Sequence, residues 1–328
     1  MEELFEKVLN RALKQHATDI HLVLKEKLII HFRVLGKLIY YDTLNYEEGY
    51  KFMNYLKYKS MINTNFRMLP QTGQFISKQR EKEFYLRVSY LPSTHFESIV
   101  IRILNNHDTL SIDEITPLDE IREFLHSISH ISSGLFLISG ATGSGKSTTL
   151  YTVLDAIIAS EKKNIITIED PIEMRKEGCL QIELNEKLGI TYQQTLRQIL
   201  RHDPDVIMIG EIRDEETAKI AITCALTGHL VLTTIHAGNA YLALKRLENL
   251  GISKIDIQDV VIGSLSQKIK YDYQHKKVII LPELMKKKDI EKSLLQQKPQ
   301  YHSFQYNVKQ LIQKHHIDDK VFEGEIYE

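Results

Sequence analysis

The chain has 328 residues, of which 43% are hydrophobic and 26% are charged, and its formal net charge at pH 7 is −1. This length and composition predict a globular protein of two domains, and the near-zero charge provides no overall positive field that would gather nucleic acid. The two cysteines, Cys179 and Cys224, form no CxxC motif and indicate a reducing compartment. The sequence shows no signal-peptide core and no apolar run of the ~20 residues that span a bilayer. We therefore expect a cytoplasmic protein that associates with a membrane only through partners.

Residues 1–105 combine helical and strand patterns. Apolar residues at helical spacing, among them Leu4, Val8 and Ala12, predict an amino-terminal helix, and the segment YEEGYKFMNYLKY predicts a second one. Short alternating segments predict strands, with Gly36 at the turn of a hairpin: DIHLVL, LIIHFRVLGKLIYY, GQFISKQR, FYLRVSYL and SIVIRIL. This mixture predicts an α+β domain.

The polar stretch at residues 106–117 is interpreted as a linker, and residues 118–328 as a second domain. In the second domain the apolar segments GLFLIS, NIITIE, DVIMIG and HLVLTTI alternate with helical patterns. Such alternation is typical of the α/β class, in which helices cover both faces of a mostly parallel sheet. Residues 285–328, which are rich in Lys, Gln and His, are interpreted as a small helical tail.

The segment GATGSGKS at residues 140–147 matches the phosphate-loop pattern GxxxxGK[ST] in full, between a predicted strand and a predicted helix. Backbone N–H groups of such a loop surround phosphates, its lysine reaches the β- and γ-phosphates, and its last hydroxyl coordinates Mg²⁺. A chance glycine-rich turn is the alternative, which the flanking strand and helix disfavour. The predicted nucleotide-binding residues, with Ser147 also a metal ligand, are Gly140, Ala141, Thr142, Gly143, Ser144, Gly145, Lys146, Ser147 and Thr148.

Carboxylates follow another predicted strand, in the segment ITIEDPIEM. Pro171 cannot continue a central strand, so the chain leaves the sheet there, with Glu169, Asp170 and Glu173 at the exit. Ligands of open α/β sheets bind outside the carboxyl ends of the strands. We therefore interpret the three carboxylates as candidates for holding a cation or a water molecule. A solvated acidic turn is the alternative.

Two further predicted strand ends carry candidate groups. The segment DVIMIGEIRDEE begins at Asp205 and brings Glu211 one glycine beyond its apolar run, where P-loop enzymes usually carry an acid near Mg²⁺. The segment LVLTTIHAG brings His236 to the same predicted edge as Lys146, although a lone histidine is more often structural. His229 lies at the opposite end of that strand and is the weaker candidate.

Together the segments GATGSGKS, TIEDPIE, DPDVIMIGEIRD and LTTIHAG resemble the phosphate loop, Asp box, Walker B motif and His box of the secretion ATPases of the type II secretion and type IV pilus superfamily. In the first half, ATDIHL, MLPQTGQF and LRVSYLPSTHFESIVIRIL are similar to further family segments. The resemblance covers about residues 12–270. It implies a RecA-like P-loop ATPase domain preceded by a smaller α+β, PAS-like domain.

The resemblance also implies roles for individual residues. Glu211 would be the Walker B acid near Mg²⁺, Glu173 would polarise the attacking water, and His236 would belong to the same catalytic site. Arg87 and Arg102 correspond to arginines that the family directs at the γ-phosphate, and their strands would pair through the PSTHFE loop. The strands alone favour solvated or salt-bridged arginines instead. ATP and Mg²⁺ are the implied cofactors, and a homohexamer that acts on a polytopic membrane platform protein is the implied assembly.

Departures from the family pattern indicate which group within the superfamily the chain resembles most. Two cysteines cannot form the four-cysteine zinc site of pilus-extension and type II secretion enzymes, so we expect no structural zinc. In the segment SLSQKI, which is expected to be helical, Lys268 replaces the arginine usual in the family. The short chain most resembles the ComGA-type ATPases that assemble competence pili for DNA uptake in Gram-positive bacteria. Pilus retraction and type II secretion are the alternatives within the superfamily.

Two interpretations from other classes of protein are disfavoured. A nucleic-acid motor needs a basic, aromatic-lined channel, which a net charge of −1 and the absence of tryptophan do not support, so direct nucleic-acid binding is not expected. A scaffold that does not hydrolyse ATP disagrees with the intact set of Lys146, Glu173 and Glu211. The segment MKKKDIEK favours a solvated helix face over a membrane-binding patch, and KHHIDDK a solvated turn over a metal site.

Overall fold

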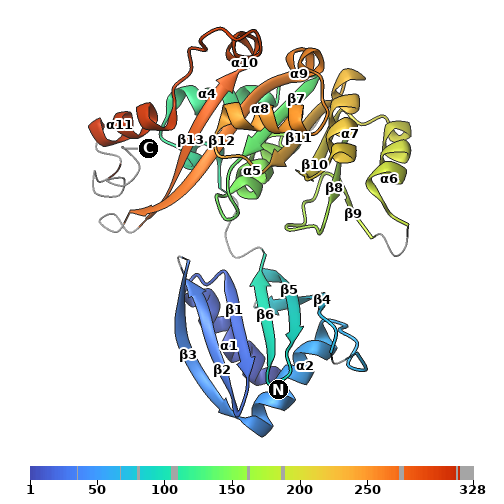
Figure 1. Cartoon of the computed structure of the whole chain (residues 1–328), viewed down its shortest axis with the longest axis vertical. Coiled ribbons are helices and arrows are strands. Elements are labelled where there is room, and N and C mark those ends of the chain that lie inside the picture. The colour runs from blue at the N-terminus through green and yellow to red at the C-terminus, as the bar shows by residue number, and fades with distance from the viewer. Residues whose placement is uncertain are drawn as a thin grey trace. The chain divides into compact units, whose positions relative to one another are not determined.

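The computed structural model describes residues 1–34, 36–66, 68–79, 82–104, 110–160, 163–185, 189–272, 277–314 and 317. The chain forms two compact units, Met1–Asp108 and Thr109–Glu328. Figure 1 labels the helices and strands of both units, and each unit is described separately.

The first unit contains an antiparallel sheet of six strands and two helices. The strand order is β3-β2-β1-β6-β5-β4, and every neighbouring pair is antiparallel. The elements are α1 (Glu2–Lys14), β1 (Asp19–Leu24), β2 (Lys27–Val34), β3 (Lys37–Asn45), α2 (Tyr46–Lys59), β4 (Gln71–Gln79), β5 (Lys82–Pro92) and β6 (Glu97–Ile103).

Both helices of the first unit pack against the same face of its sheet. The side chains that α1 buries recur at helical spacing: Phe5, Val8, Leu9 and Ala12. They share one hydrophobic core with α2 and with every second residue of the strands, for example Ile20 of β1 and Ile101 of β6. Because successive strand residues point to opposite sides, the residues between these core positions lie on the other face of the sheet.

The second unit is built on a sheet of seven strands in the order β13-β12-β7-β11-β10-β8-β9. All neighbouring pairs are parallel except β12 and β13, which are antiparallel. The strands are β7 (Gly134–Ser139), β8 (Ile165–Glu169), β9 (Leu180–Glu183), β10 (Val206–Ile212), β11 (Leu230–Ile235), β12 (Val261–Asp272) and β13 (Lys277–Lys286). The mostly parallel α/β sheet predicted for this part of the chain is confirmed.

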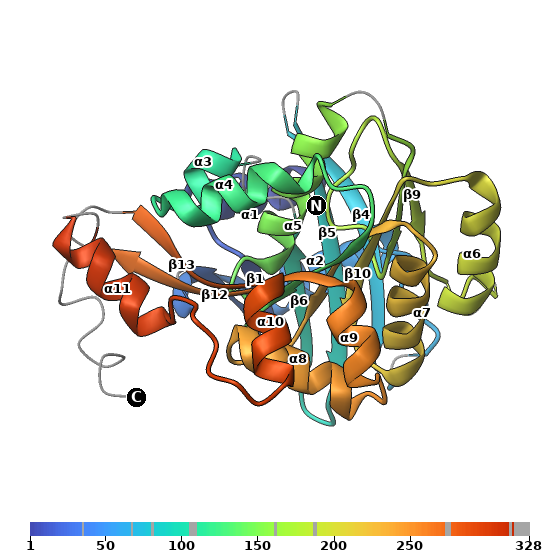
Figure 2. The same cartoon turned by 90° about the horizontal axis from the view of Figure 1, so that it is seen from above.

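Helices cover both faces of the seven-stranded sheet, as Figure 2 shows. They are α3 (Ile112–Ile115), α4 (Asp119–Ile128), α5 (Lys146–Ile158), α6 (Tyr192–Ile199), α7 (Glu215–Leu226), α8 (Ala240–Asn249), α9 (Lys254–Val260), α10 (Lys287–Leu294) and α11 (Phe304–Gln313), with the 3-10 turn η2 (Leu200–His202). Helices α6 to α10 share a core with one face, and α3, α4, α5 and α11 share a core with the other. Strand β7 contributes Leu135 to the first core and Phe136 to the second, so its apolar run is buried on both faces.

Two predicted elements of the second unit are wrong. The segment SLSQKI is not helical but lies within β12. Pairing with β7 on one side and β13 on the other satisfies the backbone of this segment, and such tertiary pairing overrides weak helix propensity. Residues 112–115 of the predicted linker form helix α3 instead. Ile112 and Ile115 of this helix are buried in the second core, while residues 105–109 lie outside the described part of the chain.

The end of β10 and the carboxyl-terminal region also differ from expectation. Strand β10 continues through Gly210 and Glu211 to Ile212, with an irregular register against β11 after Ile209, so Glu211 lies on the strand and not beyond it. The predicted helical tail contains α10 and α11, preceded by strand β13. Most of the segment KHHIDDK lies outside the described residues.

Candidate functional site

Four motif-bearing strands lie side by side in the second unit, in the order β7-β11-β10-β8. All three neighbouring pairs are parallel, so the carboxyl ends of the four strands meet at one edge of the sheet. The phosphate loop follows β7, and the segment EDPIE begins with Glu169, the last residue of β8. Glu211 lies near the end of β10, and His236 directly follows β11. This edge is the position at which α/β sheets bind their ligands.

Two glycines of the phosphate loop are required by close packing against β12. Gly140 has φ +151°, and a Cβ there would lie 2.5 Å from the carbonyl oxygen of Gln267. Gly145 has φ +82°, and its Cβ would lie 2.9 Å from the Ile269 side chain. The Gln267 side chain donates a hydrogen bond of 2.7 Å to the carbonyl of Ser144. The loop therefore packs against β12: a larger residue at Gly140 would collide with the backbone of that strand, while the left-handed φ of Gly145 favours glycine there.

Gln267 was not among the predicted site residues. It is fully buried on β12, whereas the strand segments of this unit are otherwise mostly apolar. A buried polar side chain needs a hydrogen-bond partner, and the phosphate-loop carbonyl provides one. In the sequence Gln267 stands between Ser266 and Lys268 and does not differ from its polar neighbours, so only the strand pairing of β12 shows that it is buried.

Lys146 is the first residue of α5 and is 9% exposed. Its ammonium donates hydrogen bonds of 3.0 Å to the carbonyls of Gly140 and Ala141. Burial lowers the pKa of Lys146, while the charges of Glu211 and Glu173 act in the opposite direction. These two carboxylates are therefore close enough to the lysine for their charges to act on it, as expected for groups that converge on one site.

The beginning of α5 provides backbone donors beside Lys146. Gly145 is the N-cap residue of this helix and makes no side-chain capping bond, and the first turn contains no acidic residue. The first N–H groups of a helix have no partners within the helix, and its dipole favours negative charge there. Ser147 and Thr148 of this turn are half-buried. The arrangement is suited to binding an anion such as a phosphate.

Glu211 and His236 form a link between two of the motifs. The Nε2 atom of His236 lies 2.9 Å from Oε1 of Glu211, and its Nδ1 atom lies 3.2 Å from the carbonyl oxygen of Gly140. Both ring nitrogens therefore face oxygen acceptors, and only the doubly protonated ring donates to both. His236 thus joins the acid of β10 to the first residue of the phosphate loop.

Arg213 is a second residue that the sequence reasoning missed. Its Nε atom lies 3.2 Å from Oε2 of Glu211, and its Nη1 atom lies 3.0 Å from Oδ2 of Asp170. The arginine therefore connects the ends of β10 and β8 and helps to orient the Glu211 carboxylate. Its position two residues after Glu211 in the segment GEIRD was the available signal.

The three carboxylates at the end of β8 have different surroundings: Glu169 is the last residue of the strand, and Asp170 and Glu173 follow it. Glu169 is buried and accepts hydrogen bonds from the hydroxyl of Tyr151, from Thr167 at 2.6 Å and from Gln181 at 3.1 Å. Burial raises the pKa of Glu169. Glu169 therefore joins β8 to its neighbours inside the unit. Asp170 pairs with Arg213, and Glu173 is half-buried, with a charge that raises the pKa of Lys146 against the effect of burial.

Asp205 and His229 lie at the opposite edge of the sheet. Asp205 precedes β10 and accepts a hydrogen bond of 2.6 Å from the backbone of Asn164. His229 precedes β11, and its Nδ1 atom lies 3.0 Å from the carbonyl oxygen of Cys224 and 3.0 Å from the Thr227 hydroxyl. The structure thus separates these two residues from the phosphate loop, because each precedes its strand while the loop follows β7.

The strands of Arg87 and Arg102 pair as neighbours in the first unit, and the two residues are direct partners in the register of β5 and β6. Both side chains are exposed. Arg102 also forms an ion pair with Asp19, with 2.9 Å between Nε and Oδ1. The strands pair as expected, and their register places the two arginines on one face of the sheet, while their action on a phosphate stays a prediction.

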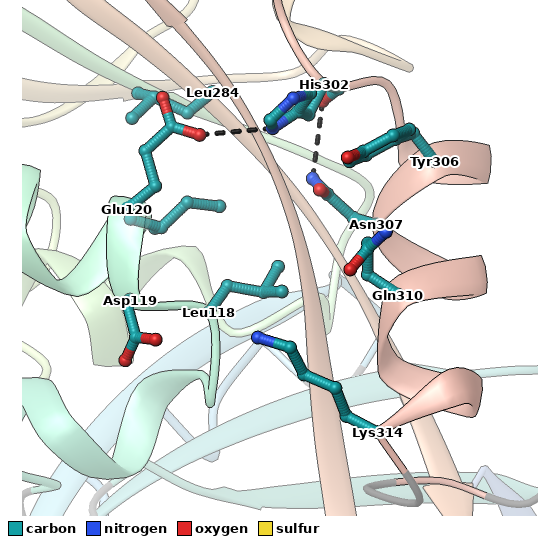
Figure 3. Close-up of a pocket in the computed structure, with 10 residues that line it drawn as sticks. Leu118, Asp119, Glu120, Leu284, His302, Tyr306, Asn307, Gln310 and Lys314 are labelled. Carbon is teal, nitrogen blue, oxygen red and sulfur yellow. Dashed lines mark hydrogen bonds and ion pairs between the residues drawn. The ribbon is translucent and has the colours of Figure 1, made fainter.

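A hollow of about 160 Å³ lies between α4 and α11, beside β13 (Figure 3). Glu120 lies 2.8 Å from the Lys286 ammonium and 3.1 Å from Nδ1 of His302, and Asn307 donates to the carbonyl of His302 at 3.3 Å. These contacts join α4 to the carboxyl-terminal segments. The residues that line the hollow do not include any of the predicted site residues.

The described residues contain no group of three or more His, Cys, Asp and Glu side chains arranged to hold a metal ion. Cys179 and Cys224 are free thiols, and burial raises the pKa of Cys179 to about 11 and that of Cys224 to about 12. Among the helices in the described ranges, none is long and apolar enough to cross a membrane.

The parallel sheet and its phosphate loop indicate a P-loop protein, and comparisons with known proteins identify the family. The family described as "Type II/IV secretion system protein" matches residues 1–313. Competence protein ComGA of Bacillus subtilis (strain 168) is 40% identical over 270 residues, which cover 82% of this chain and 76% of the relative. The chain therefore belongs to the type II/IV secretion system protein family.

Two further comparisons agree with this result. Type II secretion system protein E of Pectobacterium carotovorum subsp. carotovorum is 38% identical over 81% of this chain, which spans 54% of that longer relative. The crystal structure of the pilus retraction motor PilT with bound ADP is similar with a TM-score of 0.73 and 25% identity, over 94% of this chain and 92% of that one. The resemblance noted in the motifs is thus confirmed.

Proposed function

We propose that this chain is a P-loop ATPase that converts ATP and water to ADP and phosphate and drives the assembly of a type IV-like competence pilus for DNA uptake. The observation that carries the proposal is the meeting of the phosphate loop and Glu211 at one edge of the parallel sheet, where His236 contacts both the Glu211 carboxylate and the Gly140 carbonyl. The similarity to competence protein ComGA supports the competence role. Pilus retraction and type II secretion are the alternatives within the family.

Phosphoryl transfer depends mainly on positioning and on neutralising charge. We assign binding of the triphosphate to residues 140–148: the loop amides and the first turn of α5 surround the phosphates, and the Lys146 ammonium leaves its loop carbonyls to contact the β- and γ-phosphates. Glu173 orients the attacking water and accepts its proton. His236 keeps Glu211 aligned with the loop, since it contacts both Glu211 and Gly140.

The residues at this edge fit a magnesium ion. Mg²⁺ binds oxygen ligands and keeps several waters, and the Ser147 hydroxyl and the Glu211 carboxylate are oxygen donors of this kind. When bound, the ion neutralises charge on the β- and γ-phosphates. Glu211 is 23% exposed and is oriented by His236 and Arg213, which suits a carboxylate that contacts the ion through water.

We further propose that the second unit is RecA-like and the first PAS-like, and that six copies form a ring. Arg87 and Arg102 then contribute positive charge towards the γ-phosphate, within one subunit or between neighbours. The protein works in the cytoplasm and reaches the membrane through a polytopic platform protein. Family membership supports the assembly and its partner.

The competence role is tested by deleting the gene in its host and measuring DNA uptake and surface pili. We expect both to be lost and to be restored by the wild-type gene, because pilus assembly needs the motor. Loss of secreted proteins with intact DNA uptake would contradict the competence assignment and favour type II secretion. Purified protein is assayed in parallel, and strong stimulation of its ATPase rate by DNA would favour a nucleic-acid motor.

Replacing Arg87 or Arg102 by alanine is expected to lower kcat far more than it weakens ATP binding. An arginine that stabilises transition-state charge is worth on the order of 10³–10⁵ in rate in GTPases. The melting temperature is measured with kcat on each variant. A lowered melting temperature with unchanged kcat would show that the arginines act only within the first unit, for example through the ion pair of Arg102 with Asp19.

A further inference from the structure

Four charged side chains lie in one row across four neighbouring strands of the first unit. Arg87 of β5 pairs with Arg102 of β6, Arg102 pairs with Asp19 of β1, and Asp19 pairs with Arg33 of β2. Directly paired residues of an antiparallel sheet point to the same face. The row lies on the face opposite the hydrophobic core, because the adjacent residue Ile101 points into that core.

Asp19 is the buried member of this row, with 5% of its side chain exposed, while the side chain of Arg102 is 57% exposed. The Oδ1 atom of Asp19 accepts a hydrogen bond of 2.9 Å from Nε of Arg102, and the Oδ2 atom of Asp19 accepts one of 2.8 Å from the Thr18 hydroxyl. Arg33 is more distant, with 3.9 Å between Nε and Oδ2. Its Nη1 atom donates instead to the carbonyl of Gly36, at 3.0 Å.

The two oxygens of Asp19 therefore make different contacts, and Arg102 is its close cationic partner. A buried carboxylate is tolerated when it is paired and hydrogen-bonded, and removal of one partner leaves it uncompensated. The contact to Arg102 uses Nε, which is one of the five N–H donors of a guanidinium. The four donors on the terminal nitrogens, which form the bidentate fork that recognises phosphate, lie outside this bond.

We propose that Asp19 is a positioning residue for Arg102. Asp19 holds the guanidinium by its Nε edge, so that the terminal nitrogens point away from the sheet, beside Arg87, ready to contact a phosphate oxygen. This inference rests on the proposed action of Arg102 in ATP hydrolysis. The gain is preorganisation: an arginine already held in one orientation loses less side-chain entropy when the transition state forms.

The test is a double-mutant cycle on the full-length protein. Asp19→Ala, Arg102→Ala and the double variant are compared with the wild type for kcat, KM for ATP and melting temperature. Glu97→Gln is the matched control. Glu97 lies on β6, the strand that also carries Arg102, and the substitution weakens the ion pair of Glu97 with Lys57 in the same unit. We expect this control to keep its kcat, even if its melting temperature falls.

We expect Asp19→Ala to lower kcat by on the order of 10²-fold, the loss that a displacement of about 1 Å in a catalytic arrangement can cause, with KM little changed. In the Arg102→Ala background the same substitution should lower kcat no further, because its effect passes through Arg102. Asp19→Asn, which keeps an oxygen acceptor for Nε, should recover part of the rate.

Three outcomes would overturn the inference, each with its own pattern. If Arg102→Ala lowers kcat but Asp19→Ala does not, Asp19 has no positioning role, and the proposed function stands. If Asp19→Ala lowers kcat by the same factor in both backgrounds, its effect is a general structural one. If Arg102→Ala itself keeps the wild-type kcat, the role of Arg102 in the proposed function fails, and the positioning role fails with it.

Discussion

Replacing Lys146 by alanine is expected to abolish ATP hydrolysis and to weaken nucleotide binding severely. The substitution removes the positive charge that, in the proposed function, contacts the β- and γ-phosphates. A lost hydrogen bond to a charged group is worth about 1.5–3 kcal/mol, which corresponds to roughly 10- to 150-fold in Kd. Titration with a fluorescent ATP analogue measures Kd, and phosphate release measures hydrolysis.

Lys163→Ala is the matched control for this variant. Lys163 also has a pKa lowered by burial, and its ammonium donates to the carbonyl of Ile131 at 2.7 Å. It precedes β8, so it lies at the edge of the sheet opposite the phosphate loop. We expect Lys163→Ala to keep its affinity for nucleotide. Wild-type affinity in Lys146→Ala would contradict the assignment of residues 140–148 as the nucleotide site.

Glu173→Gln is expected to bind ATP with near wild-type affinity but to hydrolyse it far more slowly. The amide keeps the size of the side chain but cannot accept a proton from the attacking water, and a general base typically contributes about 10²–10⁴-fold in rate. Single-turnover measurements with saturating enzyme separate the chemical step from nucleotide binding and product release.

Glu177→Gln, an exposed carboxylate four residues further along the chain, is the control and should keep its kcat. If Glu173→Gln turns over at the wild-type rate, the role assigned to Glu173 is wrong, and Glu211 becomes the candidate base. The contacts of Glu211 with His236 and Arg213 favour an orienting role near Mg²⁺ instead, because they hold both of its carboxylate oxygens in place.

The convergence of the four motifs was predictable because it follows from local patterns. Each motif directly follows or ends a short apolar strand, and apolar strands that alternate with helices predict parallel neighbours. The carboxyl ends of such strands necessarily share one edge of the sheet. The sequence therefore predicts Lys146, Glu211 and His236 at one edge whatever the strand order is, and the structure brings them together there.

The surroundings of individual carboxylates were not predictable in the same way. Glu169, Asp170 and Glu173 stand within five positions in the sequence and look alike there. Their roles diverge because Glu169 meets Tyr151 and Gln181, while Asp170 meets Arg213. Each of these partners comes from a distant segment, and sequence spacing carries no information about which of them a side chain will reach.

The class of the second unit, the phosphate loop and the family all follow from the sequence, because they depend on hydrophobic periodicity and on residue types at fixed spacing. The strand identity of SLSQKI, the support of the loop by Gln267 and the row from Arg87 to Arg33 required the folded chain. These features depend on strand register and on contacts between segments far apart in the sequence. Local propensity differs by less than about 1 kcal/mol for most residues, so the pairing and packing of the complete sheet outweigh it.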